Sequence, residues 1–534
     1  MLGSQVTSDL ELEKLHKVIA TCLPWGKACF ERALKAPSSD AKVLKRTQLP
    51  LAALKADKAL TTKLRETLLD ISGAAAHIDE SLGNDDPLAS ESVSQIFFSS
   101  GSIARPLNTN NSYLNLVLFW KTIFLPAFAI LAPLIGILVP FFIFKLFGRP
   151  MTVPDYLLHV RGSILKQMSI PQFLKARNEG DRLGGFFESM AVGAALIMFI
   201  SSIWNQVNAA KHLRSIWDIL RGRGTALNTV LAGATSILAA LKSTTGAAQR
   251  AFRSLITEGD AALKGCEALK DKADIVCSGA LWNSPRILDD LRAWLGRIDM
   301  YTAIGTLPIT IVKYSDKTGL QIQGLVHPFL PSCVSNNYVS AAHSILTGPN
   351  RGGKSTFCKA LGLSLITAQT LGFAWADSMT LRPFGAIHTA LEPAGKLGYA
   401  STFEAEIVFA KSVLDVEARP LFVMMDEIFH STNAVDGLRA SGVFMDALYA
   451  KQDCVSLIST HYRDLVTQFE ATTAAYQMAA TEGETGLVYS YKIMRGVSTK
   501  SSVDELLRAH GLLAGPVRDG CVPAQQKNDA AESE

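Results

Sequence analysis

A short glycine-rich stretch, TGPNRGGKST, restricts the fold of this 534-residue chain more than any other part of it. Residues Gly348 to Ser355 fit the pattern G-x-x-x-x-G-K-[ST], whose backbone N–H groups turn inward around an anion. Such a loop lies between a buried strand and the N-terminus of a helix, where the helix dipole favours negative charge. The flanking segments HSILT and STFCKALGLSLITAQTLG are typical of that strand and that helix. We therefore expect an α/β domain with a phosphate-binding loop in this part of the chain.

Each position of the loop has an expected role in binding a nucleoside triphosphate. Lys354 would place its charge on the β- and γ-phosphates, and Ser355 would bind Mg²⁺ through its hydroxyl. ATP and Mg²⁺ are therefore the expected ligands. The expected nucleotide-binding residues are Gly348, Pro349, Asn350, Arg351, Gly352, Gly353, Lys354, Ser355 and Thr356.

Two acidic residues follow a second buried strand. The run LFVMM is apolar on both faces, as in the centre of a parallel sheet. Asp426 and Glu427 come next, at the carboxyl end of the strand, where α/β sheets place their ligands. Asp426 is expected to bind Mg²⁺ with Ser355, and Glu427 to orient the attacking water, since phosphoryl transfer depends on positioning and charge neutralisation. A third apolar run, CVSLISTHY, ends near His461, which would sense the γ-phosphate. The expected catalytic residues are Glu427, Lys354 and His461.

Composition narrows the class of protein. A chain of 534 residues is expected to form two or three domains. The net charge of +4 is short of the basic excess that marks an obvious nucleic-acid-binding protein. Eight cysteines occur without a C-x-x-C pair, which argues against a zinc site or a disulfide framework. Hydrophobic residues make up 48% of the chain and the mean hydropathy is +0.20, which together are high for a soluble protein.

The hydrophobic residues are concentrated in two runs. Residues 123–144, IFLPAFAILAPLIGILVPFFIF, are uncharged and long enough to cross a bilayer core of about 30 Å as a helix. Residues 190–204, MAVGAALIMFISSIW, form a shorter and more marginal run. One or two transmembrane helices are therefore expected. The alternative for each run is a buried helix of a soluble domain.

The topology of these runs stays open at the level of sequence. Three prolines recur every seven residues in the first run, so a kinked span and a re-entrant hairpin both fit it. The segment between the runs is rich in lysine and arginine, so the positive-inside rule places it in the cytoplasm. If each run crosses the membrane once and the nucleotide site is cytosolic, however, the segment between the runs lies on the non-cytosolic side. The three prolines are Pro126, Pro133 and Pro140.

Four motifs together resemble the MutS mismatch-repair ATPases, a branch of the ABC-type ATPases. They are TGPNRGGKST, STFEAEI, MMDEIFHSTNAVDG and STHY, in that order. The resemblance implies that Ser401, Thr402 and Glu406 form a signature that reaches the nucleotide of a partner subunit. It therefore implies a homodimer or a pair with a related subunit, and duplex DNA as a partner of the family.

The chain also departs from the family pattern. LPWGKACFERALKAPSSDAKVLKRTQ resembles the start of the family's helical core, yet it lies so early in the chain that it leaves no room for the mismatch-reading domain. The apolar runs occupy the place of the DNA-gripping clamp. Three positions near the site differ from the residues that are usual in the family: Arg351, Phe429 and His430. The contacts that the family makes with a partner subunit are therefore expected to differ here.

Together these features predict an all-α core and lever region at the N-terminus, with one or two transmembrane helices, and an α/β P-loop ATPase domain of the ABC/MutS type at the C-terminus. The favoured function is a membrane-associated ATPase, with its ATPase domain facing the cytosol, that couples ATP hydrolysis to lever motion. The alternatives are a nuclear or DNA-associated mismatch-repair ATPase and an ATP-dependent scaffold. The expected domains are the core and outgoing lever at 1–110, the hydrophobic insertion at 111–205, the returning lever and core helices at 206–300, the ATPase domain at 301–515 and a disordered tail at 516–534.

Overall fold

The computed structural model of the chain contains two compact units, each built from separate stretches of sequence. The first unit comprises Met1–Leu69, Ile237–Thr257 and Arg292–Glu534, and the second comprises Asp70–Ser236 and Glu258–Leu291. The domain bounds expected from the sequence stay predictions. The structure describes all residues except 1, 4, 84–92, 99–103, 149–151, 168–181, 271, 318, 341, 392–401, 484–485, 501–506, 508–509, 511 and 513–534. Ser401 and the expected tail at 516–534 lie outside the described residues.

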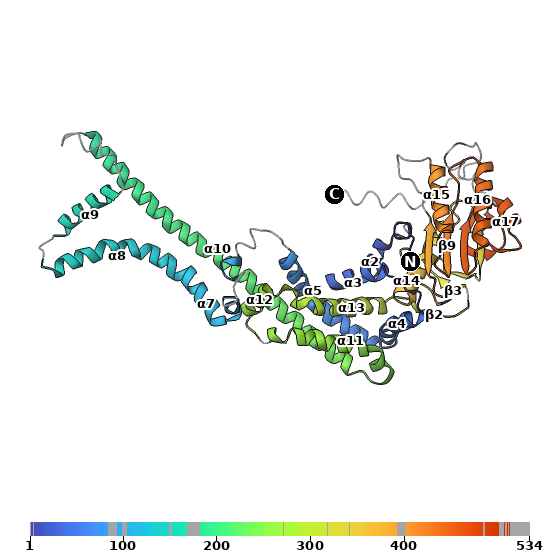
Figure 1. Cartoon of the computed structure of the whole chain (residues 1–534), viewed down its shortest axis with the longest axis horizontal. Helices are drawn as coiled ribbons and strands as arrows, with labels where there is room; N and C mark the ends of the chain where they lie inside the picture. The colour runs from blue at the N-terminus through green and yellow to red at the C-terminus, as the bar shows by residue number, and fades with distance from the viewer. Residues whose placement is uncertain are drawn as a thin grey trace. The chain divides into compact units, whose positions relative to one another are not determined.

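Most of the described N-terminal half is helical, and the described C-terminal part is α/β, as expected (Figure 1). The helices up to residue 305 are α1 Val6–Asp9, α2 Leu15–Val18, α3 Pro24–Leu34, α4 Ala41–Ala56, α5 Lys58–Gly83, α7 Asn111–Phe119, α8 Leu125–Leu146, α9 Val153–Gln167, α10 Arg182–Lys242, α11 Gly246–Gly265, α12 Asp274–Asn283 and α13 Asp289–Gly305. Short 3₁₀ or π turns are η1 Leu12–Lys14, η2 Arg105–Thr109, η3 Trp120–Phe124, η5 Glu267–Leu269 and η6 Pro285–Leu288.

The C-terminal part alternates strands and helices. Its strands are β1 Thr310–Ile311, β2 Lys313–Tyr314, β3 Leu320–Leu325, β4 Asn336–Ser340, β5 His343–Thr347, β6 Phe373–Ala374, β7 Ser378–Leu381, β8 Ala386–Ala390, β9 Leu421–Asp426, β10 Cys454–Ser459, β11 Thr473–Gly483 and β12 Gly486–Arg495. Its helices are α14 Lys354–Thr370, α15 Thr402–Leu414, α16 Ala434–Tyr449 and α17 Arg463–Gln468.

The main sheet of the described chain has the order β12-β11-β5-β10-β9-β8. Strands β11, β5, β10, β9 and β8 run parallel, and β12 pairs antiparallel with β11. Smaller sheets are formed by β2-β7-β3-β4 and by β1-β6. Strands β5 and β10 are buried throughout, and β9 is buried up to its last residue, because helices cover both faces of a parallel sheet. This burial on both faces explains why the sequences of these strands are apolar at nearly every position.

Alternate residues of β9 face different helices. Val423 and Met425 belong to a buried cluster with residues of α15, α16 and α17, such as Phe444. Met424 points the opposite way, as alternation along a strand requires, and lies against Gly362 of α14. Helix α14 therefore covers one face of the sheet, and α15 to α17 cover the other.

The beginning of the chain packs on the edge of this sheet. Leu2 forms a parallel bridge with Ile387 of β8, and the Gly3 N–H donates to the Ile387 carbonyl at 2.8 Å. Asp9 in α1 is buried, and its carboxylate accepts bonds from Thr389 Oγ1 at 2.6 Å and from the Leu391 N–H at 3.1 Å. The α/β part of the first unit therefore includes residues from the start of the chain.

In the second unit, α7, η3 and α8 form a continuous helical path. Pro126 lies in the first turn of α8, and because η3 leads into α8 without a break, its ring and missing N–H disturb the helical turn before it. The π turn of η3 comes directly before it and loosens the hydrogen-bond ladder there. Pro133 and Pro140 lie inside α8, which the structure assigns as one helix. Seven residues are almost two helical turns, so the prolines share one side of the helix.

Two helices among the described residues are long and apolar enough to cross a membrane: Asn111–Pro133 and Leu196–Lys242. This criterion concerns length and composition only, and core helices of soluble proteins also meet it. Most of the first helix is exposed, since 11% of its apolar window is buried, compared with 61% for the second. The second apolar run is part of α10, which continues past residue 205 without a break.

Candidate nucleotide site

The expected phosphate-binding loop connects β5 to α14, so the strand and helix predicted on either side of it are present. Gly353 has a φ of +94°, which favours glycine. At Gly348, with φ +155°, a Cβ would lie 3.0 Å from the Met478 side chain, so the position leaves little room for one. Arg351 adopts φ +64° at the tip of the loop, a conformation that is uncommon for a residue with a side chain.

Lys354 is the first residue of α14, and its side chain is 5% exposed. Its ammonium donates to the Gly348 carbonyl at 3.1 Å, so its charge lies within the curve of the loop. Glu427 Oε1 is 3.6 Å from Lys354 Nζ, and His461 Nε2 is 3.4 Å from it. The structure therefore brings together the three residues that the sequence predicts to be catalytic.

Asp426 lies where the ends of three elements meet. Ser355 Oγ in α14 donates to Asp426 Oδ2 at 2.5 Å, and Ser459 at the end of β10 donates to Asp426 Oδ1. Carboxylate and hydroxyl oxygens are ligands that suit Mg²⁺, which usually takes one or two protein carboxylates together with phosphates and water. Within the described ranges, no group of three or more His, Cys, Asp or Glu side chains is arranged to hold a metal ion. Ser355 and Asp426 therefore fit a Mg²⁺ ion whose other ligands come from a nucleotide and water.

Glu427 follows the last residue of β9, and its carboxylate is held by a histidine from the neighbouring strand end. His461 Nε2 lies 2.6 Å from Glu427 Oε1. This hydrogen bond, together with the nearby positive charges, holds the pKa of Glu427 below its ordinary value, against the opposing effect of burial. Glu427 is therefore ionised at neutral pH, and its carboxylate is held by His461.

A cavity of about 640 Å³ lies beside the loop. One wall is the loop itself, and the other walls come from the segment around Leu330 and Cys333 and from Met478 and Tyr491. Tyr491 has a φ of +53° and is held by its carbonyl, which accepts a bond from the Asn336 side-chain amide at 3.0 Å. The cavity therefore combines a polar phosphate-binding end with apolar and aromatic walls.

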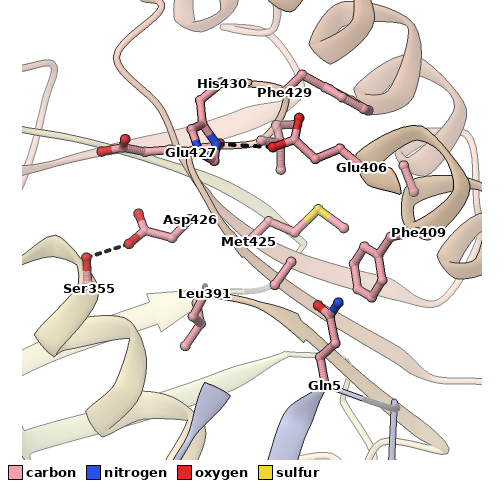
Figure 2. Close-up of a pocket in the computed structure, with 13 residues that line it drawn as sticks. Gln5, Ser355, Leu391, Glu406, Phe409, Met425, Asp426, Glu427, Phe429 and His430 are labelled. Atoms are coloured by element: carbon pink, nitrogen blue, oxygen red, sulfur yellow. Dashed lines mark hydrogen bonds and ion pairs between the residues drawn. The ribbon is translucent and has the colours of Figure 1, made fainter. Parts of the chain in front are cut away.

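A smaller cavity of about 200 Å³ lies on the α15 side of Asp426 and Glu427 (Figure 2). Gln5 and Glu406 line it. The Gln5 side-chain oxygen is buried, and it has no hydrogen-bond partner in the part of the chain that is described. Figure 2 shows the Gln5 side chain directed into this cavity.

The expected signature residues are only partly described. Thr402 is the exposed first residue of α15. Glu406 contacts two residues of its own chain: Ser431 Oγ donates to Glu406 Oε2 at 2.8 Å, and His430 Nδ1 lies 3.3 Å from Glu406 Oε1. The contact of these signature residues with a partner subunit's nucleotide stays a prediction.

Three residues at the site were not expected from the sequence. Ser459 binds Asp426, and it could have been found because it ends the strand that precedes His461. The sequence around Tyr491 or Gln5 gives no indication that either residue lies at the site. Tyr491 comes from the antiparallel strand β12, and Gln5 comes from the start of the chain. Their positions depend on tertiary packing alone.

Comparison with known proteins gives matches in the same part of the chain. Residues 344–511 match the family model described as MutS domain V. The DNA mismatch repair protein MutS from one strain of Thermus thermophilus is 29% identical over 227 residues, which cover 41% of this chain and 28% of that protein. The protein of the same name from a second strain of this bacterium is also 29% identical over 227 residues, covering 41% of this chain and 27% of that protein. The match thus spans less than a third of the length of these relatives.

Proposed function

By its C-terminal domain this chain belongs to the MutS family, and on that premise we propose that it binds and hydrolyses ATP with Mg²⁺. The observation that carries the proposal is the meeting of Lys354, Asp426 and Glu427 at one edge of the sheet, beside a cavity that has room for a nucleotide. A strand-end acid with a phosphate-binding lysine is the arrangement that phosphoryl transfer uses.

Different residues of the site have different roles in hydrolysis. The loop N–H groups and Lys354 hold the phosphates and offset their charge. Ser355 and Asp426 hold Mg²⁺, which when bound neutralises charge on the phosphate oxygens. Glu427 accepts a hydrogen bond from the attacking water and aligns it with the terminal phosphorus, while His461 keeps the Glu427 carboxylate in place. The proton of the water passes to solvent or phosphate as the bond to the leaving oxygen breaks.

The apolar part of the larger cavity suits the base of the nucleotide. Tyr491 lies next to the loop, since a Cβ at Gly353 would be 3.2 Å from its ring. An aromatic ring beside a purine gains stacking and apolar burial. This geometry supports a nucleoside triphosphate over inorganic triphosphate as the substrate.

Hydrolysis by the purified full chain tests this proposal. Phosphate release from ATP is measured with Mg²⁺, with excess EDTA, and for Lys354→Ala. We expect turnover with Mg²⁺, none with EDTA and none for the variant, whose binding of a fluorescent ATP analogue should also weaken. Equal phosphate release by Lys354→Ala and the unaltered chain would show that the activity does not come from this site.

We further propose that the chain is attached to a membrane through α8, whose first part overlaps the candidate span Asn111–Pro133. Its 22 residues measure about 33 Å as a helix, enough for a bilayer core. Among its described side chains, large apolar ones are exposed near both ends and between them, such as Phe128 at 52% and Leu146 at 85%. An uncovered apolar surface of this extent is unusual for a soluble monomer. The ATPase domain would then face the cytosol, and its motion would be transmitted to the bilayer segment.

Action on duplex DNA is the alternative function, because the Thermus relatives are named as DNA mismatch repair proteins. An ATP-dependent scaffold without DNA is the second alternative. Washing of cell membranes with alkaline carbonate separates these functions, because an integral membrane protein stays in the pellet. A protein that acts on DNA would instead be released and would bind duplex with an affinity that falls steeply as salt rises. The scaffold would be released and would bind no duplex.

A further inference from the structure

The loop that follows β9 is strained where it presents Glu427. Glu427 has a φ of +52° and Phe429 a φ of +55°, although neither is glycine. Side chains rarely adopt this left-handed conformation, and it persists only where surrounding contacts hold it. The contacts that hold this loop therefore determine how the Glu427 carboxylate is aimed.

Glu406 in α15 provides two of these contacts, of which Figure 2 shows the one with His430. Ser431 Oγ donates to one of its carboxylate oxygens at 2.8 Å, and His430 Nδ1 lies 3.3 Å from the other. The same His430 nitrogen lies 2.7 Å from the Glu427 carbonyl oxygen, so a proton on Nδ1 is shared between that carbonyl and Glu406. The Glu406 side chain is 11% exposed, which leaves little water to compete for these bonds.

A third contact joins the same helix to the loop. The Phe403 ring, one turn earlier in α15, meets the Phe429 ring edge to face with centroids 6.0 Å apart. Phe429 is buried and belongs to the cluster that contains Phe444. Helix α15 thus contacts the strained loop at three successive residues: Phe429 through the Phe403 ring, and His430 and Ser431 through the Glu406 carboxylate.

We propose that Glu406 is a positioning residue that links α15 to the water-orienting Glu427. It acts through His430 and Ser431, so any shift of α15 changes the aim of the Glu427 carboxylate. Because α15 begins next to the expected signature residues, this link would make hydrolysis depend on the state of that helix. The expected effect on hydrolysis rests on the proposed ATPase function. The contacts of Glu406 with His430 and Ser431 do not depend on that function.

The test compares three variants on the full chain. Glu406→Ala removes both contacts, whereas Glu406→Gln keeps one acceptor oxygen and so can retain one of the two bonds. Glu417→Ala is the control, because Glu417 is an exposed carboxylate that follows α15 and lies outside the signature motif. We measure kcat and KM for ATP, and amide hydrogen exchange of the peptide that contains residues 427–431.

Glu406→Ala is expected to lower kcat by about tenfold or more while KM changes by less than about twofold, the pattern of an interaction that matters in the transition state. Exchange of the 427–431 peptide should speed up while that of α14 stays the same. Glu406→Gln should recover part of both properties, and Glu417→Ala should match the unaltered chain. Adding Ser431→Ala to Glu406→Ala should cause little further loss, because the Ser431 hydroxyl has then already lost its bond to Glu406.

Unchanged exchange of the 427–431 peptide in Glu406→Ala would overturn the proposal, whatever the activity. An equal loss of kcat in Glu406→Gln and Glu406→Ala would also overturn it, since the retained oxygen would then have no effect. If Glu406→Ala does not fold, His430→Ala provides the exchange measurement in its place. If the unaltered chain hydrolyses no ATP, the proposed function fails, and hydrogen exchange still decides whether Glu406 holds the loop.

Discussion

Glu427 Oε1 lies 2.6 Å from His461 Nε2, although the two residues follow different strands of the sheet. They meet because β9 and β10 are adjacent and parallel, with Asp426 opposite Ser459 in the register. The carboxyl ends of the two strands therefore place a carboxylate and an imidazole side by side. The pair gives the expected water-orienting acid a fixed direction and a lowered pKa.

Replacement of Glu427 by glutamine should separate ATP binding from hydrolysis. The amide cannot take the carboxylate's part in orienting and polarising water, so kcat should fall by roughly a hundredfold or more. Binding of ATP should persist, because Lys354 and the loop hold the phosphates. Stopped-flow phosphate release and equilibrium binding of a fluorescent analogue measure the two properties. Glu417→Gln, an exposed acid before β9, is the control. A Glu427→Gln variant with unaltered turnover would remove this residue from the mechanism.

The acid limit of hydrolysis should reflect the lowered pKa of Glu427. The ionised carboxylate is the active form, so activity is retained as pH falls until it passes the pKa in the folded protein, which lies below the ordinary glutamate value of about 4.3. His461→Ala removes the main cause of the shift, so the acid limb should move to higher pH. Rates of the two proteins across a pH series, with folding followed by circular dichroism, check this. Identical acid limbs would mean that His461 does not set the pKa.

Complementation between two inactive variants should reveal whether the site is shared between subunits. Ser401→Ala damages the expected signature, and Lys354→Ala damages the phosphate-binding loop. A heterodimer of the two would contain one site with both lesions and one with neither, so activity should reappear when the proteins are mixed. ATP hydrolysis before and after mixing, with light scattering for mass, measures this. A fully active protein that remains monomeric on dilution would contradict the dimeric arrangement.

Polar substitutions on α8 should convert a membrane protein into a soluble one. Leu, Ile and Phe each favour the centre of a span by roughly 0.3–0.6 kcal/mol, so five substitutions remove a few kcal/mol of insertion free energy. Five exposed positions suit this test: Phe128, Leu131, Ile135, Leu138 and Phe142.

With all five changed to glutamine, the chain should leave the carbonate-washed membrane and still hydrolyse ATP, since none of these residues lines the nucleotide cavity. The control carries five glutamine substitutions at exposed polar positions of α11. Recovery of the unaltered chain in the soluble fraction without detergent would disprove the membrane attachment.

Local chemistry explains how much of the site was predictable. The strand before the loop and the helix after it are β5 and α14, because the glycine pattern works only in that setting. Asp426 and Glu427 follow β9 as expected, since an apolar run that is buried on both faces must end where polar groups begin. These features depend on residues that are neighbours in sequence.

The rest depends on contacts between distant segments. Glu406 was expected to face a partner's nucleotide, yet it also holds Ser431 of its own chain, and sequence spacing carries no sign of that bond. Helix α10 continues past residue 205, because the sequence SSIWNQVNAAKHLRS contains no proline or glycine that would end it. The expected domain boundary at residue 205 was based on hydrophobicity alone.

The pairing of Leu2 with β8 has a consequence for how the protein is made. Residues near the start of the chain leave the ribosome long before β8 does, so Leu2 cannot pair with Ile387 until β8 has been synthesised. Pairings between such distant segments are slow to form. A fragment that begins at residue 301 would leave β8 as a bare edge and uncover the apolar surface that Leu10 protects on α14. Such a fragment should associate with itself, and adding a peptide of residues 2–19 during refolding should keep it dispersed.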